Sequence, residues 1–309
     1  MGRFVLRRAL SIIPTVFIII TLGFFIIRVA PGGPFSREKA VPEAVLRNLM
    51  AKYHMDEPLI KQYFRFLGDV LRGDLGPSFV NKDYSVNELI ALSLPNSMIL
   101  GLVALSLAVV LGVTTGTVSA LKQNTAVDYS FMSVAVTGIS VPNFVVGPVL
   151  MLVFAVWLRW LPTSGWIDGR NGMRTLILPA VTLSLAQFAY IARLTRASML
   201  ETLRSDYIRT ARAKGLSTPV IIFKHAFKGA CLPVVSYLGP AMAGLITGSV
   251  VVERIFAVPG LGIHFIRAAT NRDYTMIMGD VIVYSLKLIA LNFVVDILYG
   301  FLDPRISYK

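Results

Sequence analysis

Charged residues are scarce in this 309-residue sequence: they make up 15% of the chain, against roughly 25% in typical soluble domains. Hydrophobic residues make up 55%, and the mean hydropathy is +0.68. A soluble globular protein of this size would need more polar surface, and a disordered chain would hold fewer apolar residues. The composition therefore indicates a membrane protein with several spans.

Cysteine, histidine and the common catalytic motifs are also nearly absent. Cys231 is the only cysteine, and His54, His225 and His264 lie far apart, so neither a disulfide framework nor a metal site is expected. The sequence lacks a G-x-x-x-x-G-K-[ST] loop, an H-E-x-x-H motif and a G-x-S-x-G motif. We therefore expect no catalytic residues and no cofactor bound by this chain.

An intramembrane hydrolase is the competing enzyme interpretation. Only Asp280 and Asp296 support it, and they belong to one apolar run. Sixteen residues of helix separate them by about 24 Å, which is too far for shared acid–base chemistry.

Six apolar runs are long enough to cross a hydrocarbon core of about 30 Å as helices. They cover residues 9–27, 96–121, 129–158, 175–194, 229–252 and 276–301. The first run exceeds the 7–15 apolar residues of a signal peptide, which predicts an uncleaved helix. The third run is long for one crossing and contains Pro142 and Pro148, so we expect a kinked helix there.

The distribution of basic residues predicts the orientation. Seven Lys and Arg residues fall in 195–228, against three each in 159–174 and 253–275. Basic loops remain cytoplasmic, which places this loop and both termini inside and makes 30–94 a small outer lobe between the first span (1–29) and the core (95–309). The net charge of +13 is then explained by these loops, and no basic soluble domain is present to bind nucleic acid.

Polar and small residues inside the runs suggest two further features. Lys287 and Asn292 are candidate substrate-path residues, although Lys287 could equally form a structural ion pair with a neighbouring helix or subunit. Gly112-x-x-x-Gly116 and Gly244-x-x-x-Gly248 predict close helix packing, within one subunit or, alternatively, in a dimer.

The polar loop between the fourth and fifth runs has amphipathic patterning. Apolar residues at helical spacing predict a helix over Met199–Lys214, ended by Gly215, and a second short helix from Thr218 to Lys228. Such a pair could lie on the membrane surface or form a socket for a cytoplasmic partner.

This loop resembles that of bacterial ABC-importer permeases in the oligopeptide/dipeptide branch. The resemblance is carried by the segments Tyr207–Leu216, His225–Lys228 and Leu232–Pro233, preceded by Arg193–Arg196. The general importer motif begins Glu-Ala-Ala, whereas this sequence has Arg209, Thr210 and Ala211 at those positions, as the peptide branch does. Further segments across the whole chain are similar to the B-type subunit of these systems: Arg28–Gly32, Gly73–Gly76, Ala120–Asn124, Thr247–Glu253, Pro259–Gly262, Asn271–Tyr274 and Asp303–Arg305. Phe79, the segment Lys82–Val86 and the short loop after the third run are most similar to oligopeptide permeases.

The resemblance implies an all-α polytopic protein with the type I ABC-importer transmembrane fold, six helices and a small periplasmic insertion. It implies a multi-pass protein of the bacterial inner membrane that imports oligopeptides and is no enzyme. The implied partners are a C-type permease, two ATPase subunits that bind ATP and Mg, an extracytoplasmic peptide-binding protein and membrane lipid.

Residues 204–228 would seat in a cleft of an ATPase subunit, with coupling contacts from Arg209, Thr210, Ala211, Arg212, Ala213, Lys214 and Gly215. The alternative substrates are dipeptides, nickel complexes or other small peptide-like solutes. A secondary transporter would need an inverted repeat, and a channel would need a selectivity ring; neither pattern is found in the sequence.

Overall fold

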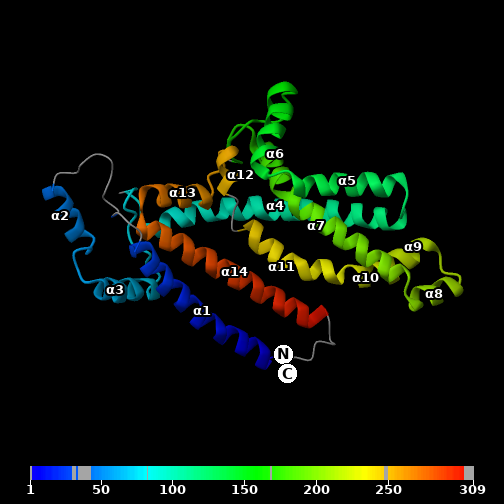
Figure 1. Cartoon of the computed structure of the whole chain (residues 1–309), viewed down its shortest axis with the longest axis horizontal. Helices are drawn as coiled ribbons and strands as arrows, with labels where there is room; N and C mark the ends of the chain where they lie inside the picture. Colours follow the sequence, from blue (N-terminus) through cyan, green and yellow to red (C-terminus); the bar gives the residue numbers. More distant parts are fainter. Residues whose placement is uncertain are drawn as a thin grey trace. The chain divides into compact units, whose positions relative to one another are not determined.

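The computed structural model describes residues 2–29, 33, 43–81, 83–167, 169–246 and 250–302. These residues form helices joined by short loops (Figure 1). The α-helices are α1 (Gly2–Val29), α2 (Glu43–Lys52), α3 (Leu59–Leu71), α4 (Val86–Leu121), α5 (Ala126–Ser140), α6 (Asn143–Leu150), α7 (Ile177–Leu203), α8 (Asp206–Ala213), α9 (Thr218–Val220), α10 (Phe227–Ala230), α11 (Leu232–Ile246), α12 (Val250–Ile255), α13 (Leu261–Asn271) and α14 (Tyr274–Leu302). Two π-helical turns, Met151–Trp157 and Ile221–Ala226, follow α6 and α9, and a 3₁₀ turn at Gly172–Leu176 precedes α7.

Four stretches of the described chain are long and apolar enough to cross a membrane as single helices. They are Arg8–Val29, Val86–Leu121, Gly172–Leu203 and Tyr274–Val294. The first and last agree with the predicted runs. The second begins ten residues earlier than predicted, at Val86 instead of residue 96, because α4 continues into the segment that was assigned to the outer lobe.

The third predicted run is not one kinked helix but two helices bent by 110°. Helix α5 ends at Ser140, and α6 begins at Asn143. Between them Val141 has extended backbone angles (φ −99°, ψ 121°), as expected for a residue that precedes a proline. Pro142 thus ends the first helix where the sequence suggested only a kink. A second bent pair, Thr218–Ala230 and Leu232–Met242, meets at 48° at the start of the fifth predicted run.

Contacts divide the chain into two compact units, of which the first comprises residues 1–96 and 259–290. Its core contains aromatic side chains from α1 and α3. Phe24 is completely buried and contacts Tyr63 and Phe66, with ring centroids 5.3 Å and 5.7 Å apart. The Tyr63 hydroxyl lies 2.8 Å from the hydroxyl of Thr21. These contacts fix α3 along the end of α1.

Asp273 joins the loop after α3 to the start of α14 in this first unit. Its Oδ1 accepts a hydrogen bond from the backbone N–H of Met276 (3.2 Å), so it caps α14. Its Oδ2 accepts from the Ser78 hydroxyl (2.5 Å) and the Val80 N–H (3.2 Å). One buried carboxylate therefore satisfies a helix terminus and holds the loop at residues 77–81.

The second unit comprises residues 97–258 and 291–309, and α7 lies at its centre. Helix α5 packs along α7, and α7 also contacts α6 and α11 (Figure 1). Gly112 and Gly116 of α4 lie against the same helix. A Cβ atom at Gly116 would lie 2.4 Å from the carbonyl oxygen of Ala192, and one at Gly112 would lie 2.7 Å from Ile191. The first glycine pattern therefore packs within one subunit, as predicted.

The second glycine pattern differs. A Cβ atom at Gly244 would meet no described atom within 4 Å, so at this position no described helix approaches α11 as closely as α7 approaches α4. Gly248 lies outside the described residues. The same spacing thus corresponds to close packing in α4 and to open space in α11.

We expect Gly116→Ala to destabilise the protein and Gly244→Ala to leave its stability unchanged or higher. The methyl group at 116 would force α4 and α7 apart, at a cost of roughly 1–3 kcal/mol in the free energy of unfolding. At 244 the methyl has space, and replacing a helical glycine adds up to about 1 kcal/mol. Thermal unfolding of the purified protein measures both changes. Equal midpoints for the two variants would contradict the close α4–α7 contact.

Candidate functional site

Residues 204–228, here called the knob, lie beyond the end of α7 in the second unit, where α8 and α9 turn back toward α10 (Figure 1). The structure does not contain the single helix that was predicted over Met199–Lys214. Helix α7 instead runs from Ile177 to Leu203, and α8 begins at Asp206. The chain breaks because Ser205 has extended angles (φ −68°, ψ 155°), and its hydroxyl donates to the carbonyl of Thr202 (2.6 Å).

Gly215 ends α8, as the sequence predicted. Its φ is +76°, a conformation that glycine adopts without steric cost. The N–H of Gly215 donates to the carbonyl of Arg212 (2.9 Å), and the N–H of Leu216 donates to that of Ala211 (3.3 Å). This pair of bonds is a Schellman motif, which satisfies the last carbonyls of the helix and reverses the chain.

The inner face of α8 holds the knob together. Ile208 is completely buried and Ala211 is 6% exposed. They pack against Met199 from α7 and against Ile221 and Ala226. Ile221 and Ala226 are the first and last residues of the π-helical turn. Its i→i+5 hydrogen bonding directs side chains five residues apart to the same side, so both can contact α8. The knob is thus a packed unit and not a flexible linker.

Ala211 differs from the other predicted coupling residues in its burial. It was expected to allow close approach of a partner, but its side chain faces the interior of the chain. The other six predicted coupling residues are exposed: Arg209, Thr210, Arg212, Ala213, Lys214 and Gly215. The structure brings these six together on the outer surface of α8 and its end.

The outer surface also carries apolar side chains that sequence reasoning missed. Tyr207, Leu216, Val220 and Phe223 are exposed, Phe223 by 72%. Their signal in the sequence was the presence of large apolar residues on the polar side of each short helix. Arg209 lies 3.4 Å from Asp206, but both side chains are almost fully exposed, so this ion pair adds little stability. The surface offers cations around an apolar centre, a composition suited to a protein partner.

A buried ion pair supports α7 near the knob. Arg196 donates from Nε to Oδ1 of Asp128 (2.7 Å) and from Nη2 to Oδ2 (2.6 Å). Asp128 is 1% exposed and also accepts from the Ser119 hydroxyl and from the N–H of Asn124 (3.0 Å). It thereby joins the end of α4, the start of α5 and the last third of α7. Sequence reasoning missed Asp128, whose signal was a lone acidic residue at the edge of an apolar run.

The predicted substrate-path residues Lys287 and Asn292 lie on α14, and both are half-buried. Five residues along a helix turn the side-chain direction by about 140°. The two residues therefore project from nearly opposite sides of α14 and do not form a pair. Their role stays a prediction.

No group of three or more His, Cys, Asp or Glu residues converges into a metal site within the described ranges. Cys231 is a free thiol. The surface of the knob carries cationic and apolar side chains.

Comparison with known proteins agrees with this description of a helical membrane chain. The model of the family "Binding-protein-dependent transport system inner membrane component" matches residues 108–308. The model of its N-terminal part, "Binding-prot-dependent transport system membrane comp, N-term", matches residues 1–101. The chain belongs to this family. This inner membrane transport component is a permease subunit and not an enzyme, as the sequence predicted.

Individual relatives extend over the full length. The oligopeptide transport system permease protein OppB of Salmonella typhimurium is 52% identical over 308 residues, which is 100% of both chains. The protein of the same name in Escherichia coli K12 is 51% identical, again over 100% of both. The dipeptide transport system permease protein DppB of Bacillus subtilis is 44% identical, over 99% of this chain and 98% of that one.

A solved structure shares the fold. A chain of the MetNI methionine ABC transporter, in an inward-facing conformation, aligns with a TM-score of 0.57. The alignment covers 70% of this chain and 96% of the other at 18% identity. The all-helical ABC-importer fold that the sequence predicted is therefore confirmed.

Removing the Asp128 carboxylate should destabilise the permease strongly. Asp128→Asn keeps the shape but leaves the Arg196 guanidinium without its bidentate partner, at a cost of about 3 kcal/mol or more. Asp206→Asn is the matched control, because it removes the exposed pair with Arg209 and should cost less than about 1 kcal/mol. Thermal unfolding of the purified permease compares the two. Similar losses in both variants would mean that burial adds nothing to the Asp128–Arg196 pair.

Proposed function

We propose that this chain is the transmembrane permease subunit of an ATP-driven importer that moves oligopeptides into the cytoplasm. One observation carries the proposal: the full-length relatives at 51–52% identity are named oligopeptide permeases. The relative named for dipeptides is less similar, at 44%. Dipeptides, nickel complexes and other small peptide-like solutes are the alternative substrates.

The proposed topology has six spans with both termini in the cytoplasm. Four helices long enough to cross, together with two bent pairs that would each count as one span, support this number. The seven basic residues of 195–228 support a cytoplasmic location for the knob. In this topology residues 1–29 form the first span, 30–94 lie outside as a lobe that receives the binding protein, and 95–309 form the permease core.

The knob is proposed to bind an ATPase subunit. Its outer surface presents Arg209, Arg212 and Lys214 around exposed apolar side chains such as Phe223, whereas Ala211 anchors α8 to the chain. Because α8 packs on the end of α7, a displacement of the knob would move a helix that spans the second unit. The full assembly would contain a C-type permease, two ATPase subunits that hold ATP and Mg, and an extracytoplasmic binding protein.

Lys287 and Asn292 are retained as candidate substrate-path residues. Their positions on opposite sides of α14 mean that only one of them can face a given cavity. Lys287→Met and Asn292→Leu should therefore not impair transport equally.

Peptide uptake tests the proposed function. A bacterial strain that lacks its own peptide importers and expresses this chain with its partner subunits should take up labelled Ala-Ala-Phe in an ATP-dependent manner. An excess of unlabelled tripeptide should compete more strongly than an excess of dipeptide or of a nickel complex. Stronger competition by the dipeptide than by the tripeptide would instead identify dipeptides as the substrates. Absence of any peptide uptake from the assembled, ATP-hydrolysing complex would refute the proposal.

The turn at Gly215 tests the coupling role of the knob. A β-branched residue at φ +76° is strained by about 1–3 kcal/mol, whereas asparagine tolerates this conformation. No atom lies within 4 Å of a Cβ at this position, so backbone conformation alone separates the variants. We expect Gly215→Val to lose stimulation of ATP hydrolysis by peptide-loaded binding protein and Gly215→Asn to retain it. Full stimulation in both variants would show that coupling does not depend on the shape of this turn.

A further inference from the structure

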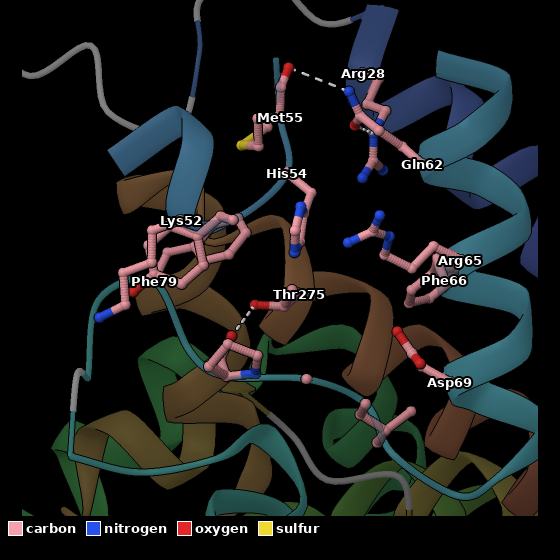
Figure 2. A pocket seen from close by; sticks show the side chains of 14 residues that line it. Arg28, Lys52, His54, Met55, Gln62, Arg65, Phe66, Asp69, Phe79 and Thr275 are labelled. Atoms are coloured by element: carbon pink, nitrogen blue, oxygen red, sulfur yellow. Dashed lines mark hydrogen bonds between the residues drawn. The ribbon is translucent and has the colours of Figure 1, made fainter. Parts of the chain in front are cut away.

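The first unit contains a pocket of about 170 Å³ that no part of the proposed transport mechanism uses. Its walls come from five segments of the chain: the end of α1, the turn after α2, one face of α3, the loop before α4 and the start of α14. Figure 2 shows the guanidinium groups of Arg28 and Arg65 and the imidazole of His54 directed toward one another across this space.

Arg28 is held in position by neutral groups. Its Nε donates to Oε1 of Gln62 (3.2 Å), and its guanidinium lies 3.5 Å from the ring centroid of Phe24. Gln62 is itself fixed, because its amide donates to the backbone carbonyls of Met55 (3.2 Å) and Glu57 (2.8 Å). Among the described residues no carboxylate pairs with Arg28. A guanidinium positioned in this way is ready to bind an anion.

The remaining lining has an excess of positive charge. Arg65 and Lys52 add two cations, and Asp69 is the one acidic side chain among the lining residues that the structure describes. Glu57, behind the lining, accepts from Arg65 at 2.8 Å and from Lys61 at 3.2 Å, and lies 3.6 Å from His54. The Glu57 carboxylate thus interacts with three basic neighbours and not with Arg28, whose guanidinium lines the pocket.

Apolar side chains form the rest of the wall. They are Tyr53, Met55, Phe66, Leu75, Pro77 and Phe79. The rings of Tyr53 and Phe79 contact each other, with centroids 4.7 Å apart. Such a wall favours an anion that carries an apolar group over a fully hydrated inorganic one. The volume is below the roughly 300–1,000 Å³ that encloses a whole drug-sized ligand, so the pocket fits one end of a longer molecule.

We propose that this pocket binds an organic carboxylate, with the carboxylate held by Arg28 and Arg65 and its apolar side group against Phe66 and Phe79. Guanidinium groups bind carboxylates through two parallel hydrogen bonds. The C-terminal residue of a short peptide has this chemistry, and so does a free apolar acid. Naming a peptide as the source rests on the proposed function, whereas the carboxylate chemistry does not.

Ligand binding to the full chain, purified with its partner subunits in lipid nanodiscs, tests this proposal. The probes are Ala-Ala-Phe and N-acetylphenylalanine, each compared with its own carboxamide by isothermal titration calorimetry. We expect each acid that binds to do so at least about tenfold more tightly than its amide. Binding of both acids identifies a general site for small acids, and binding of the tripeptide alone identifies a peptide as the source.

Three variants assign the effect to the pocket. Arg28→Gln and Arg65→Gln should each remove most of the preference for the acid over the amide. Arg72→Gln is the matched control, because it removes the same charge from an exposed residue outside the lining and should keep the preference. Thermal midpoints verify folding, and Arg65→Gln gives the answer if Arg28→Gln does not fold.

Three results would overturn the proposal: equal affinity for acid and amide, an unchanged preference in both pocket variants, or complete displacement of the acid by millimolar inorganic phosphate. The last result would identify an oxyanion site without a role for the apolar wall. Failure of Ala-Ala-Phe uptake in cells would refute the oligopeptide function while leaving the binding of N-acetylphenylalanine intact, so the two proposals fail separately.

Discussion

The arrangement around the knob depends on one buried carboxylate. Asp128 is almost inaccessible to solvent, yet it must remain ionised to accept the two hydrogen bonds of Arg196. A buried charge is tolerated only where its partners are complete, so the end of α4, the start of α5 and α7 are held in one relative position. Helix α7 then continues for about two turns from Arg196 to the knob.

Two kinds of contact fix α7 along its length, and they differ in what they permit. At Gly112 and Gly116 the backbones of α4 and α7 approach so closely that no side chain fits between them, which favours rigid movement of the pair. The knob packs on the end of α7 through small and aliphatic side chains such as Ala211 and Ile208. A force applied to the exposed cations of α8 would thus be transmitted to a helix that cannot bend away from its neighbour. This property is what the proposed coupling to an ATPase requires.

Features set by local chemistry were predictable from the sequence, and features set by tertiary contacts were not. Gly215 was predictable because a helix stop needs only a local conformation, and apolar length located four stretches that could cross as single helices, although not all of their limits. Pro142 signals a helix break locally, but the sequence does not give the 110° angle between the two helices, and the inward direction of Ala211 depends on the side chains that pack against it. Asp128 was missed for the same reason, since its partners Ser119, Asn124 and Arg196 surround it only in three dimensions. The pocket that contains Arg28 and Arg65 likewise combines side chains from both ends of the first unit's sequence.

The two glycine patterns show why sequence spacing alone cannot separate an internal contact from an external one. Both spacings predict two glycines on one helix face. Gly112 and Gly116 of α4 lie against α7, whereas a Cβ atom at Gly244 of α11 would meet no described atom within 4 Å. Gly244 is exposed in α11, and small residues are the ones that helices in membranes use to approach each other. The glycine spacing therefore marks a face on which close helix contact is sterically possible, and the neighbouring elements decide whether that contact forms.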